Sequence, residues 1–322
     1  MYTGQTGWGI RPFCQRIVKY IYMDEITLRS FAKINLTLEV LDKRRDGYHN
    51  LDSITQVIDI SDEVTVSKTE PGLIDVTVDV QDVPAGKSNL VFRACRAFFR
   101  YTGIYGGAVC RLAKTVPVKA GLGGGSANAA AAIAGLDRIY ETNLTHTQLI
   151  DVSSTVGSDA ALFVYGGTCR LRSRGEDVVS LPDAPQLHLV VIKPHDGVVT
   201  KWAYGELDKQ PRLRSRSASD EMESAIRNAD LDSVVQLMQN DFDVVITSAY
   251  DDIAQAKRVL ADHGSVGTML AGSGACVFGV FDSREQAEDA ALDIKGSFES
   301  VFAVSSLTRE QSCLVSEAQC AI

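Results

Sequence analysis

The sequence lacks the usual marks of a membrane, secreted or metal-binding protein. It has no run of about 18 apolar residues, so no segment is predicted to span a bilayer. Its seven cysteines are scattered without a Cys-x-x-Cys pair, and its five histidines are equally dispersed. Neither a disulfide framework nor a zinc cluster is therefore expected. We expect reduced thiols and a cytoplasmic protein.

Positive charge is also scarce. Lys and Arg together number 32 against 41 Asp and Glu, which gives a formal net charge of −9. A surface of this sign does not favour nucleic acids or anionic membranes, although it is compatible with a local basic pocket. We therefore expect a small-molecule partner, no nucleic-acid or membrane partner, and a monomer or weak homodimer.

Residues 1–22 differ in composition from the rest of the chain. They carry Arg11, Arg16 and Lys19 but no acidic residue, and they lack the apolar core of a secretory signal. We expect an extension that is disordered or a misassigned start, with the functional beginning at Met23. A plastid transit peptide is the alternative.

The hydrophobic pattern predicts a mixed α+β protein. Apolar and polar residues alternate over 26–40 and 73–80, which is typical of strands, whereas apolar residues recur every three or four positions over 89–101, which is typical of a helix. Further strands are predicted near 54–60, 64–68, 108–112, 162–165, 168–171, 187–193, 266–270, 275–281 and 302–307. Further helices are predicted at 147–156, 220–228, 231–239, 253–263 and 285–295.

A length of 322 residues fits two domains of roughly 150 residues each. The order of the elements predicts a strand-rich N-terminal domain over 23–180 and a C-terminal domain over 181–309. A mobile connection is predicted at 205–219, which is rich in arginine and serine, and residues 310–322 are predicted to form a frayed tail.

The strongest local signal is a glycine loop, with four glycines between positions 121 and 125 ahead of an alanine-rich run. Alanine favours helix, so a helix is predicted to begin within one or two residues of Ser126, a residue type that caps helices well. Glycines let backbone N–H groups converge on one point, and the helix N-terminus adds positive polarity there. The loop therefore predicts a phosphate site; a tight turn without a ligand is the alternative.

Two other phosphate-binding loops fit less well. The sequence contains no Gly-x-x-x-x-Gly-Lys-Ser/Thr motif, which excludes the P-loop of nucleotide hydrolases. Gly121, Gly123 and Ser126 half-match a dinucleotide fingerprint, but Glu141 lies within or just after the helix rather than at the end of a second strand. Residues 114–119 are also too polar for a Rossmann first strand.

Several motifs resemble those of one family. The segment 117–130 (Pro-x-x-x-Gly-Leu-Gly-Gly-Gly-Ser-Ala-Asn-Ala-Ala) looks like the ATP loop of the GHMP kinases, which include galacto-, homoserine, mevalonate and phosphomevalonate kinases. Residues 32–36, 156–163 and 270–278 resemble the family's other motifs, in matching order. The resemblance covers 25–305 and implies a two-domain GHMP kinase fold. It also implies an ATP-binding N-terminal domain, a ferredoxin-like C-terminal domain and a site between them.

Phosphoryl transfer to an alcohol needs a carboxylate that accepts the hydroxyl proton, and Asp159 is the natural candidate. Lys33 is a lone cation in an apolar strand, where burial is costly unless the charge is paired, and pairing with Asp159 would remove that cost. Asn35 lies on the same strand face and can hold the substrate. The alternatives are a helix cap for Asp159, a snorkelling side chain for Lys33 and a local backbone contact for Asn35.

The run Arg-Asp-Gly-Tyr-His at 45–49 resembles the segment of those GHMP kinases whose substrate carries a cytidine diphosphate moiety. By that resemblance Tyr48 stacks on the cytosine, and His49 or its backbone bonds the base edge. Tyr204 is a second aromatic, with Thr200 nearby. The remaining predicted substrate contacts are Gly272, Ser273 and Gly274. An exposed turn aromatic for Tyr48 and helix packing for Tyr204 are the alternatives.

The resemblance implies ATP and Mg²⁺ as cofactors. Its ATP contacts fall on Asn89, Lys114, Pro117, Gly121, Leu122, Gly123, Gly124, Gly125, Ser126 and Ala127. Ser126 is a candidate metal contact, but no acidic cage is evident, so phosphate and water are expected to supply most ligands. Ala127 stands where many relatives have a second serine, which removes one candidate phosphate contact.

The resemblance therefore implies an ATP-dependent kinase that phosphorylates an alcohol in non-mevalonate isoprenoid precursor biosynthesis. Another GHMP small-molecule kinase and a non-catalytic nucleotide or metabolite sensor are the alternatives. Loss of Lys33 or Asp159 would favour the sensor, and both residues are present.

Overall fold

The computed structural model describes residues 24–157, 159–195, 197–210 and 217–314. The predicted extension at 1–22 lies outside the described residues, as does the tail from 315 onward. The predicted connection at 205–219 is described only at its two ends. Its first residues, 205–207, belong to the helix α5 (Thr200–Leu207), and its last residues, 218–219, belong to α6 (Ala218–Arg227).

Seven strands form the first sheet, in which the long antiparallel pair β1 and β2 is central. These strands are β1 (Glu25–Lys43), β2 (His49–Thr69), β3 (Ile74–Val78), β4 (Gly107–Ala113), β5 (Thr168–Ser173), β6 (Asp177–Ser180) and β8 (Gln239–Asn240). One half of β2 pairs with β4 and the other half with β5, so the two sheet branches diverge from the same strand.

The second sheet has four antiparallel strands in the order β11-β7-β10-β9. These strands are β7 (His188–Lys193), β9 (Gly267–Leu270), β10 (Val277–Phe281) and β11 (Ser300–Ser305). Along β7 the buried side chains alternate: Leu189 and Val191 face one core cluster, and Val190 and Ile192 face another. The second sheet is therefore covered on both faces.

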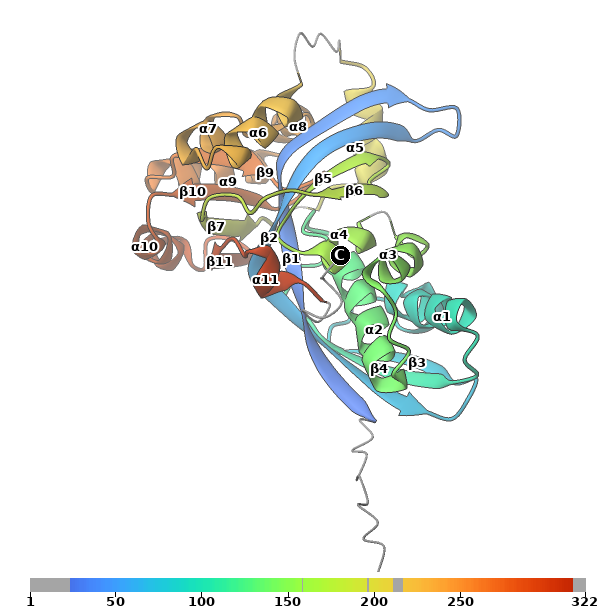
Figure 1. The fold of residues 1–322 in the computed structure, drawn as a ribbon. Coiled ribbons are helices and arrows are strands. Elements are labelled where there is room, and N and C mark those ends of the chain that lie inside the picture. The colour runs from blue at the N-terminus through green and yellow to red at the C-terminus, as the bar shows by residue number, and fades with distance from the viewer. Residues whose placement is uncertain (1–23, 158, 196, 211–216, 315–322) are drawn as a thin grey trace, which may run out of the picture.

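The remaining elements are helices. They are α1 (Leu90–Thr102), α2 (Gly124–Tyr140), α3 (His146–Ser154), α4 (Ala160–Tyr165), α7 (Leu231–Gln236), α8 (Phe242–Ala249), α9 (Asp251–Asp262), α10 (Arg284–Ile294), α11 (Arg309–Ser312) and the 3-10 turn η1 (Gly86–Ser88). Figure 1 shows β1 and β2 running through the middle of the molecule, with α1–α4 on one side and the second sheet on the other.

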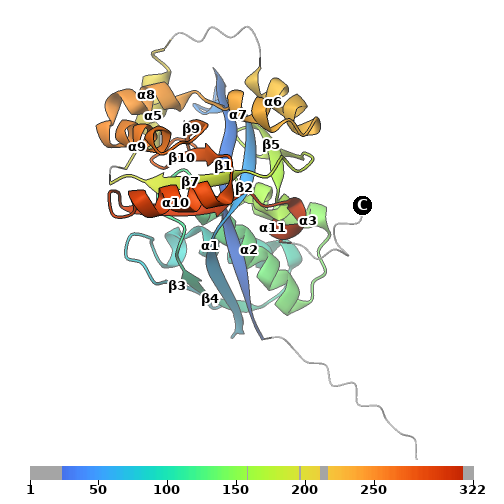
Figure 2. The ribbon, with the colours of Figure 1, turned by 90° about the vertical axis from the view of Figure 1, so that its left-hand side faces the viewer.

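Three core clusters define the layers. One lies between the first sheet and α1–α4, a second between the two sheets and under α6 and α7, and a third between the second sheet and α5, α8, α9 and α10. Figure 2 shows α10 and α9 over the outer face of the second sheet. The fold is α+β, as predicted, and its layers are helix, sheet, sheet and helix. None of the described helices has the length and apolar character needed to cross a membrane.

The predicted strand at 162–165 is wrong, because these residues belong to α4. All five residues from Ala160 to Val164 are buried. A short, fully buried apolar run has no periodicity that separates helix from strand. The helix begins at two alanines, which are good helix formers.

Other differences concern element lengths and short elements that the pattern misses. The strands predicted at 54–60 and 64–68 are one strand, β2, because residues 61–63 continue its pairing with β1. The pattern does not predict α5, α8, β6 and β8. Strand β8 lies in the C-terminal half but pairs with β1, so the sheets interlock, and the division at residue 180 stays a prediction.

Candidate active site

Two neighbouring cavities share part of the glycine loop at 121–126. The large cavity has a volume of about 880 Å³ and the small cavity about 620 Å³. Gly121, Gly123 and Thr200 line both. A molecule in one cavity can therefore meet a molecule in the other across this loop.

The structure places most of the predicted residues in the expected cavity. Those lining the large cavity are Lys33, Asn35, Tyr48, His49, Asp159, Thr200, Tyr204, Gly272 and Ser273. Those lining the small cavity are Asn89, Lys114, Pro117, Gly121, Leu122, Gly123, Gly124, Gly125 and Ser126. The predicted acceptor-side residues are thus separated from the predicted ATP-side residues by the loop itself.

Two predicted contact residues line neither cavity. Ala127 is 1% exposed and belongs to the core cluster beneath α1–α4. The amide of Gly274 donates a hydrogen bond to the carbonyl of Ala271 at 2.9 Å, which closes the turn that carries Ser273. Both residues therefore lie behind residues that line the cavities and do not line a cavity themselves.

The glycine loop has the conformation that its composition predicts. Gly121 (φ +79°) and Gly123 (φ +74°) are left-handed, a region that favours glycine. Helix α2 begins at Gly124, within two residues of Ser126 as predicted, but its N-cap residue is Gly123 and not Ser126. Because Gly123 to Ser126 line the small cavity, the positive end of α2 faces that cavity.

A buried carboxylate holds the loop from below. Asp62, on β2, is fully buried and accepts hydrogen bonds from the backbone amides of Thr115 and Val116 at 2.8 Å each. It also accepts from Lys114 Nζ and, at 2.8 Å, from Asn128 Nδ2 on α2. This cluster ties the segment before the loop, and the helix after it, to the central strand.

The sequence pattern does not single out Asp62 or Asn128. Lys33 is identified because it is a charged residue within an alternating apolar strand. Asp62 also lies next to alternating apolar residues, so the same argument could have identified it. The structure also gives Lys114 and Asn89 local partners: Lys114 pairs with Asp62, and Asn89 caps α1 by accepting from the amide of Val91 at 2.8 Å. Their predicted contacts with ATP stay predictions.

Replacing Asp62 by Asn is expected to lower the free energy of unfolding by about 3–5 kcal/mol, because Lys114 would remain buried without its counter-charge. The KM for ATP is expected to rise as the loop loses its anchor. Urea unfolding and initial rates measure both effects. The matched control is Asp79→Asn, which affects only an exposed contact to the amide of Lys114. Equal effects of the two substitutions would contradict a special role for Asp62.

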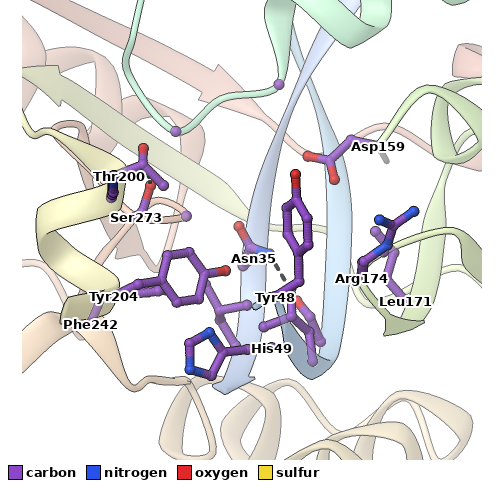
Figure 3. A pocket seen from close by; sticks show the side chains of 18 of the residues that line it. Asn35, Tyr48, His49, Asp159, Leu171, Arg174, Thr200, Tyr204, Phe242 and Ser273 are labelled. Atoms are coloured by element: carbon purple, nitrogen blue, oxygen red, sulfur yellow. Dashed lines mark hydrogen bonds between the residues drawn. The ribbon is translucent and has the colours of Figure 1, made fainter. Parts of the chain in front are cut away.

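Lys33, Asn35 and Asp159 meet at the inner end of the large cavity. Lys33 Nζ donates to Asn35 Oδ1 at 2.8 Å and lies 3.9 Å from Asp159 Oδ2. Asn35 Nδ2 donates in turn to Ser53 Oγ at 2.8 Å, drawn as a dashed line in Figure 3. Burial lowers the pKa of Lys33 below its usual value, and the nearby Asp159 carboxylate opposes that shift.

The surrounding elements orient these groups. On β1 the even-numbered residues Ala32, Ile34 and Leu36 face the core between the sheets, so Lys33 and Asn35 face the cavity. Asp159 directly precedes α4, and its side chain makes no capping bond to that helix. Asp159 is thus the N-cap residue of α4 by position, but its carboxylate makes no capping hydrogen bond. The snorkelling alternative for Lys33 is contradicted, because its side chain is 6% exposed.

Aromatic rings gather at the outer end of the large cavity. Tyr48 is 60% exposed and points into the cavity (Figure 3). Tyr204 stacks on His49 with ring centroids 5.0 Å apart and meets Phe242 edge-on at 4.8 Å. The two tyrosines line the same cavity, but the predicted sandwich around a base stays a prediction.

Two charged residues complete this end of the cavity, and the sequence motifs do not predict them. The Arg174 guanidinium lies 5.1 Å from the centroid of the Tyr48 ring, and both side chains are labelled in Figure 3. Asp208, at the end of α5, contacts His49 Nε2. Neither residue lies in a sequence motif. Arg174 lies shortly before β6 and Asp208 follows α5, and the sequence pattern predicts neither of these elements.

A glycine loop at a helix N-terminus, beside an acceptor cavity that holds a Lys–Asp pair, defines a small-molecule kinase. Family models agree: residues 89–167 match the GHMP kinases N terminal domain, and residues 222–300 match the GHMP kinases C terminal domain. A homoserine kinase from Cytophaga hutchinsonii shares the fold at a TM-score of 0.73 and 21% identity, over 90% of this chain and 96% of that one.

More similar relatives narrow the family. A 4-diphosphocytidyl-2-C-methyl-D-erythritol kinase of Moorella thermoacetica is 38% identical over 86% of this chain and 97% of its own length. One of Caldicellulosiruptor bescii is 34% identical over 83% of this chain and 93% of its own. A crystal structure of a 4-(cytidine 5'-diphospho)-2C-methyl-D-erythritol kinase has a TM-score of 0.72 at 25% identity, over 87% of this chain and 99% of that one.

The chain belongs to the family of 4-diphosphocytidyl-2-C-methyl-D-erythritol kinases within the GHMP kinases. It is an ATP-dependent kinase with a small-molecule substrate.

Proposed function

We propose that the chain transfers the γ-phosphoryl group of ATP to the C2 hydroxyl of 4-diphosphocytidyl-2-C-methyl-D-erythritol, a step of non-mevalonate isoprenoid precursor biosynthesis. The carrying observation is the pair of adjoining cavities. The large cavity has an aromatic end and a Lys–Asp end, and the glycine loop lies between it and the small cavity. The names of the relatives supply the substrate.

The small cavity suits the triphosphate of ATP. The amides at the start of α2 can donate to phosphate oxygens, and the glycines leave room for close approach. For Mg²⁺, Ser126 is the candidate protein ligand, and its Oγ lies close to Gly157. Among the described residues, no group of three or more His, Cys, Asp or Glu side chains is placed so that it could hold a metal ion. Phosphate oxygens and water would thus supply most ligands of Mg²⁺, which neutralises phosphate charge when bound.

The large cavity orders the acceptor. We place the hydroxyl between Asp159 and Lys33, where Asp159 accepts its proton as the oxygen–phosphorus bond forms and the bond from phosphorus to the ADP oxygen breaks. Lys33 stabilises the negative charge around the transferring group, and Asn35 holds Lys33 in line by accepting its hydrogen bond. The cytidine end then lies against Tyr48, His49 and Tyr204.

Replacing Tyr48 by Ala is expected to raise the KM for the cytidyl substrate about 5- to 150-fold with kcat little changed, because stacking on a base contributes about 1–3 kcal/mol. Initial rates at saturating ATP measure the effect. Tyr48→Phe, which keeps the ring, should stay near wild type. Tyr105→Ala, at an 81% exposed tyrosine outside both cavities, controls for general effects. An unchanged KM in Tyr48→Ala would remove the proposed stack.

ADP release with ATP and Mg²⁺ tests the acceptor directly. The panel is 4-diphosphocytidyl-2-C-methyl-D-erythritol, mevalonate, homoserine and galactose. Release confined to the first compound supports the proposal. ADP release with another acceptor would agree with kinase activity but overturn the assignment of Tyr48 and His49 to the base. If no acceptor causes ADP release although ATP binds, a non-catalytic sensor is favoured.

A further inference from the structure

A chain of hydrogen bonds leads from the Lys–Asp end of the large cavity into the sheet behind it. Lys33 Nζ donates to Asn35 Oδ1, and Asn35 Nδ2 donates to Ser53 Oγ, each at 2.8 Å. The Ser53 hydroxyl donates in turn to the backbone carbonyl of Thr37 at 2.5 Å. Asn35 and Ser53 are 4% and 2% exposed, so these bonds are shielded from water. The chain thus ties the Lys33 side chain on β1 to the neighbouring strand β2.

The two ends of this chain fix the direction of every bond in it. An ammonium group can only donate, so Asn35 turns its oxygen toward Lys33 and its amide nitrogen toward Ser53. A backbone carbonyl can only accept, so Thr37 takes the single proton of the Ser53 hydroxyl. Ser53 therefore meets Asn35 as an acceptor. Only this arrangement satisfies all three bonds.

The ammonium group of Lys33 lies between two acceptors. It donates to Asn35, and it is 3.9 Å from the carboxylate of Asp159, the one acidic group among the described residues that lies within 4 Å of it. The stem of Lys33 is confined, because a Cβ atom at Gly123 would lie 3.1 Å from its Cγ. A buried ammonium group that lost the bond to Asn35 would therefore close the remaining gap to Asp159. A tight ion pair would then occupy the carboxylate that has to accept the hydroxyl proton.

We infer that Ser53 is a positioning residue for phosphoryl transfer. It anchors Asn35, and Asn35 in turn keeps Lys33 from closing on Asp159. The carboxylate thus stays able to accept the proton of the acceptor hydroxyl, although Ser53 itself does not handle that proton. The inference deepens the proposed function and rests on it for the roles of Lys33 and Asp159.

Replacing Ser53 by Ala is expected to lower kcat for 4-diphosphocytidyl-2-C-methyl-D-erythritol about tenfold, the order expected for one lost hydrogen bond, with both KM values within about twofold of wild type. Ser53→Thr keeps the hydroxyl and should restore kcat. The matched control is Ser219→Ala on α6, because the fully buried Ser219 hydroxyl contacts Thr37 Oγ1 at 2.9 Å and lines neither cavity. This control should lose similar stability in urea but leave kcat unaltered.

A double-mutant cycle separates positioning from a structural role. Lys33→Met removes the group that Ser53 is inferred to position, so Ser53→Ala should have little further effect on the single-turnover rate in that background. A structural role would lower the rate by the same factor in both backgrounds, and this result would overturn the inference. Because Ser53 lines the large cavity, a direct contact with the substrate is the other alternative. A raised KM for the acceptor with an unchanged kcat would show that contact and would also overturn the inference.

A crystal structure of the Ser53→Ala variant tests the inference without turnover. We expect Lys33 Nζ to leave Asn35 and to lie about 2.7–2.9 Å from Asp159, the distance of a charge-assisted hydrogen bond. An unchanged position of Lys33 would overturn the inference. Failure of the proposed function looks different, because the wild type then does not phosphorylate 4-diphosphocytidyl-2-C-methyl-D-erythritol although Lys33 still shifts in the variant.

Discussion

Replacing Asp159 by Asn is expected to lower kcat about 100- to 10,000-fold, the usual contribution of a positioned general base. The amide fits the same space but cannot accept the hydroxyl proton. ATP binding should stay close to wild type, because Asp159 lines the large cavity and is absent from the lining of the small one. Single-turnover kinetics and calorimetry with a non-hydrolysable ATP analogue separate the two effects.

The control for this substitution is Asp151→Asn, which removes a carboxylate from the exposed face of the neighbouring helix α3. It should leave kcat unaltered. Asp159→Asn combined with Lys33→Met should cost little more than either change alone, because the two side chains act on one group. A near wild-type kcat in Asp159→Asn would show that another group takes the proton.

Replacing Gly121 by Ala should damage the fold as well as the site. A Cβ atom at Gly121 would lie 1.9 Å from the carbonyl oxygen of Ala271, and the residue has φ +79°. Here the glycine loop packs directly on the segment 270–278, backbone against backbone, so no flexible side chain can yield. Strain and overpacking together predict a loss of about 2–6 kcal/mol in the free energy of unfolding.

The same substitution should weaken ATP binding, because the loop must move away from its support. Urea unfolding and calorimetry with the ATP analogue measure the two losses. Gly125→Ala is the stability control: it has no positive φ, and its Cβ would make an ordinary contact of 3.4 Å with Leu90 Cδ1. If Gly121→Ala matched this control in stability, the contact between the glycine loop and the segment 270–278 would be unimportant.

The sequence predicts those parts of the site that are local. The glycine loop is predicted because its backbone conformation requires glycine. Tyr48 and His49 are predicted because they lie in a short segment that resembles a family motif. Lys33 is found by a different argument, since a charge inside an apolar strand needs a partner. Lys33 Nζ donates a hydrogen bond to Asn35 Oδ1, however, and Asp159 lies farther away, at 3.9 Å.

The contacts that the sequence does not predict come from distant segments. Asp208 reaches His49 across 159 positions and Asp62 reaches Asn128 across 66, and no periodic pattern carries such pairings. Helix α5 is missed because its exposed face is polar and it precedes an arginine-rich segment. The strand predicted at 162–165 fails for the opposite reason, because α4 is apolar on every side.

The most direct test of the account is the position of the phosphate on the product. The chain, ATP, Mg²⁺ and 4-diphosphocytidyl-2-C-methyl-D-erythritol are incubated, and the product is observed by phosphorus-31 NMR. The C2 carbon carries a methyl group and no hydrogen, so a phosphate placed there by Asp159 and Lys33 gives a phosphomonoester signal without coupling to a carbinol hydrogen. A signal split by the hydrogens of C1 or C3, or the absence of any phosphomonoester, would contradict the proposed placement of the hydroxyl.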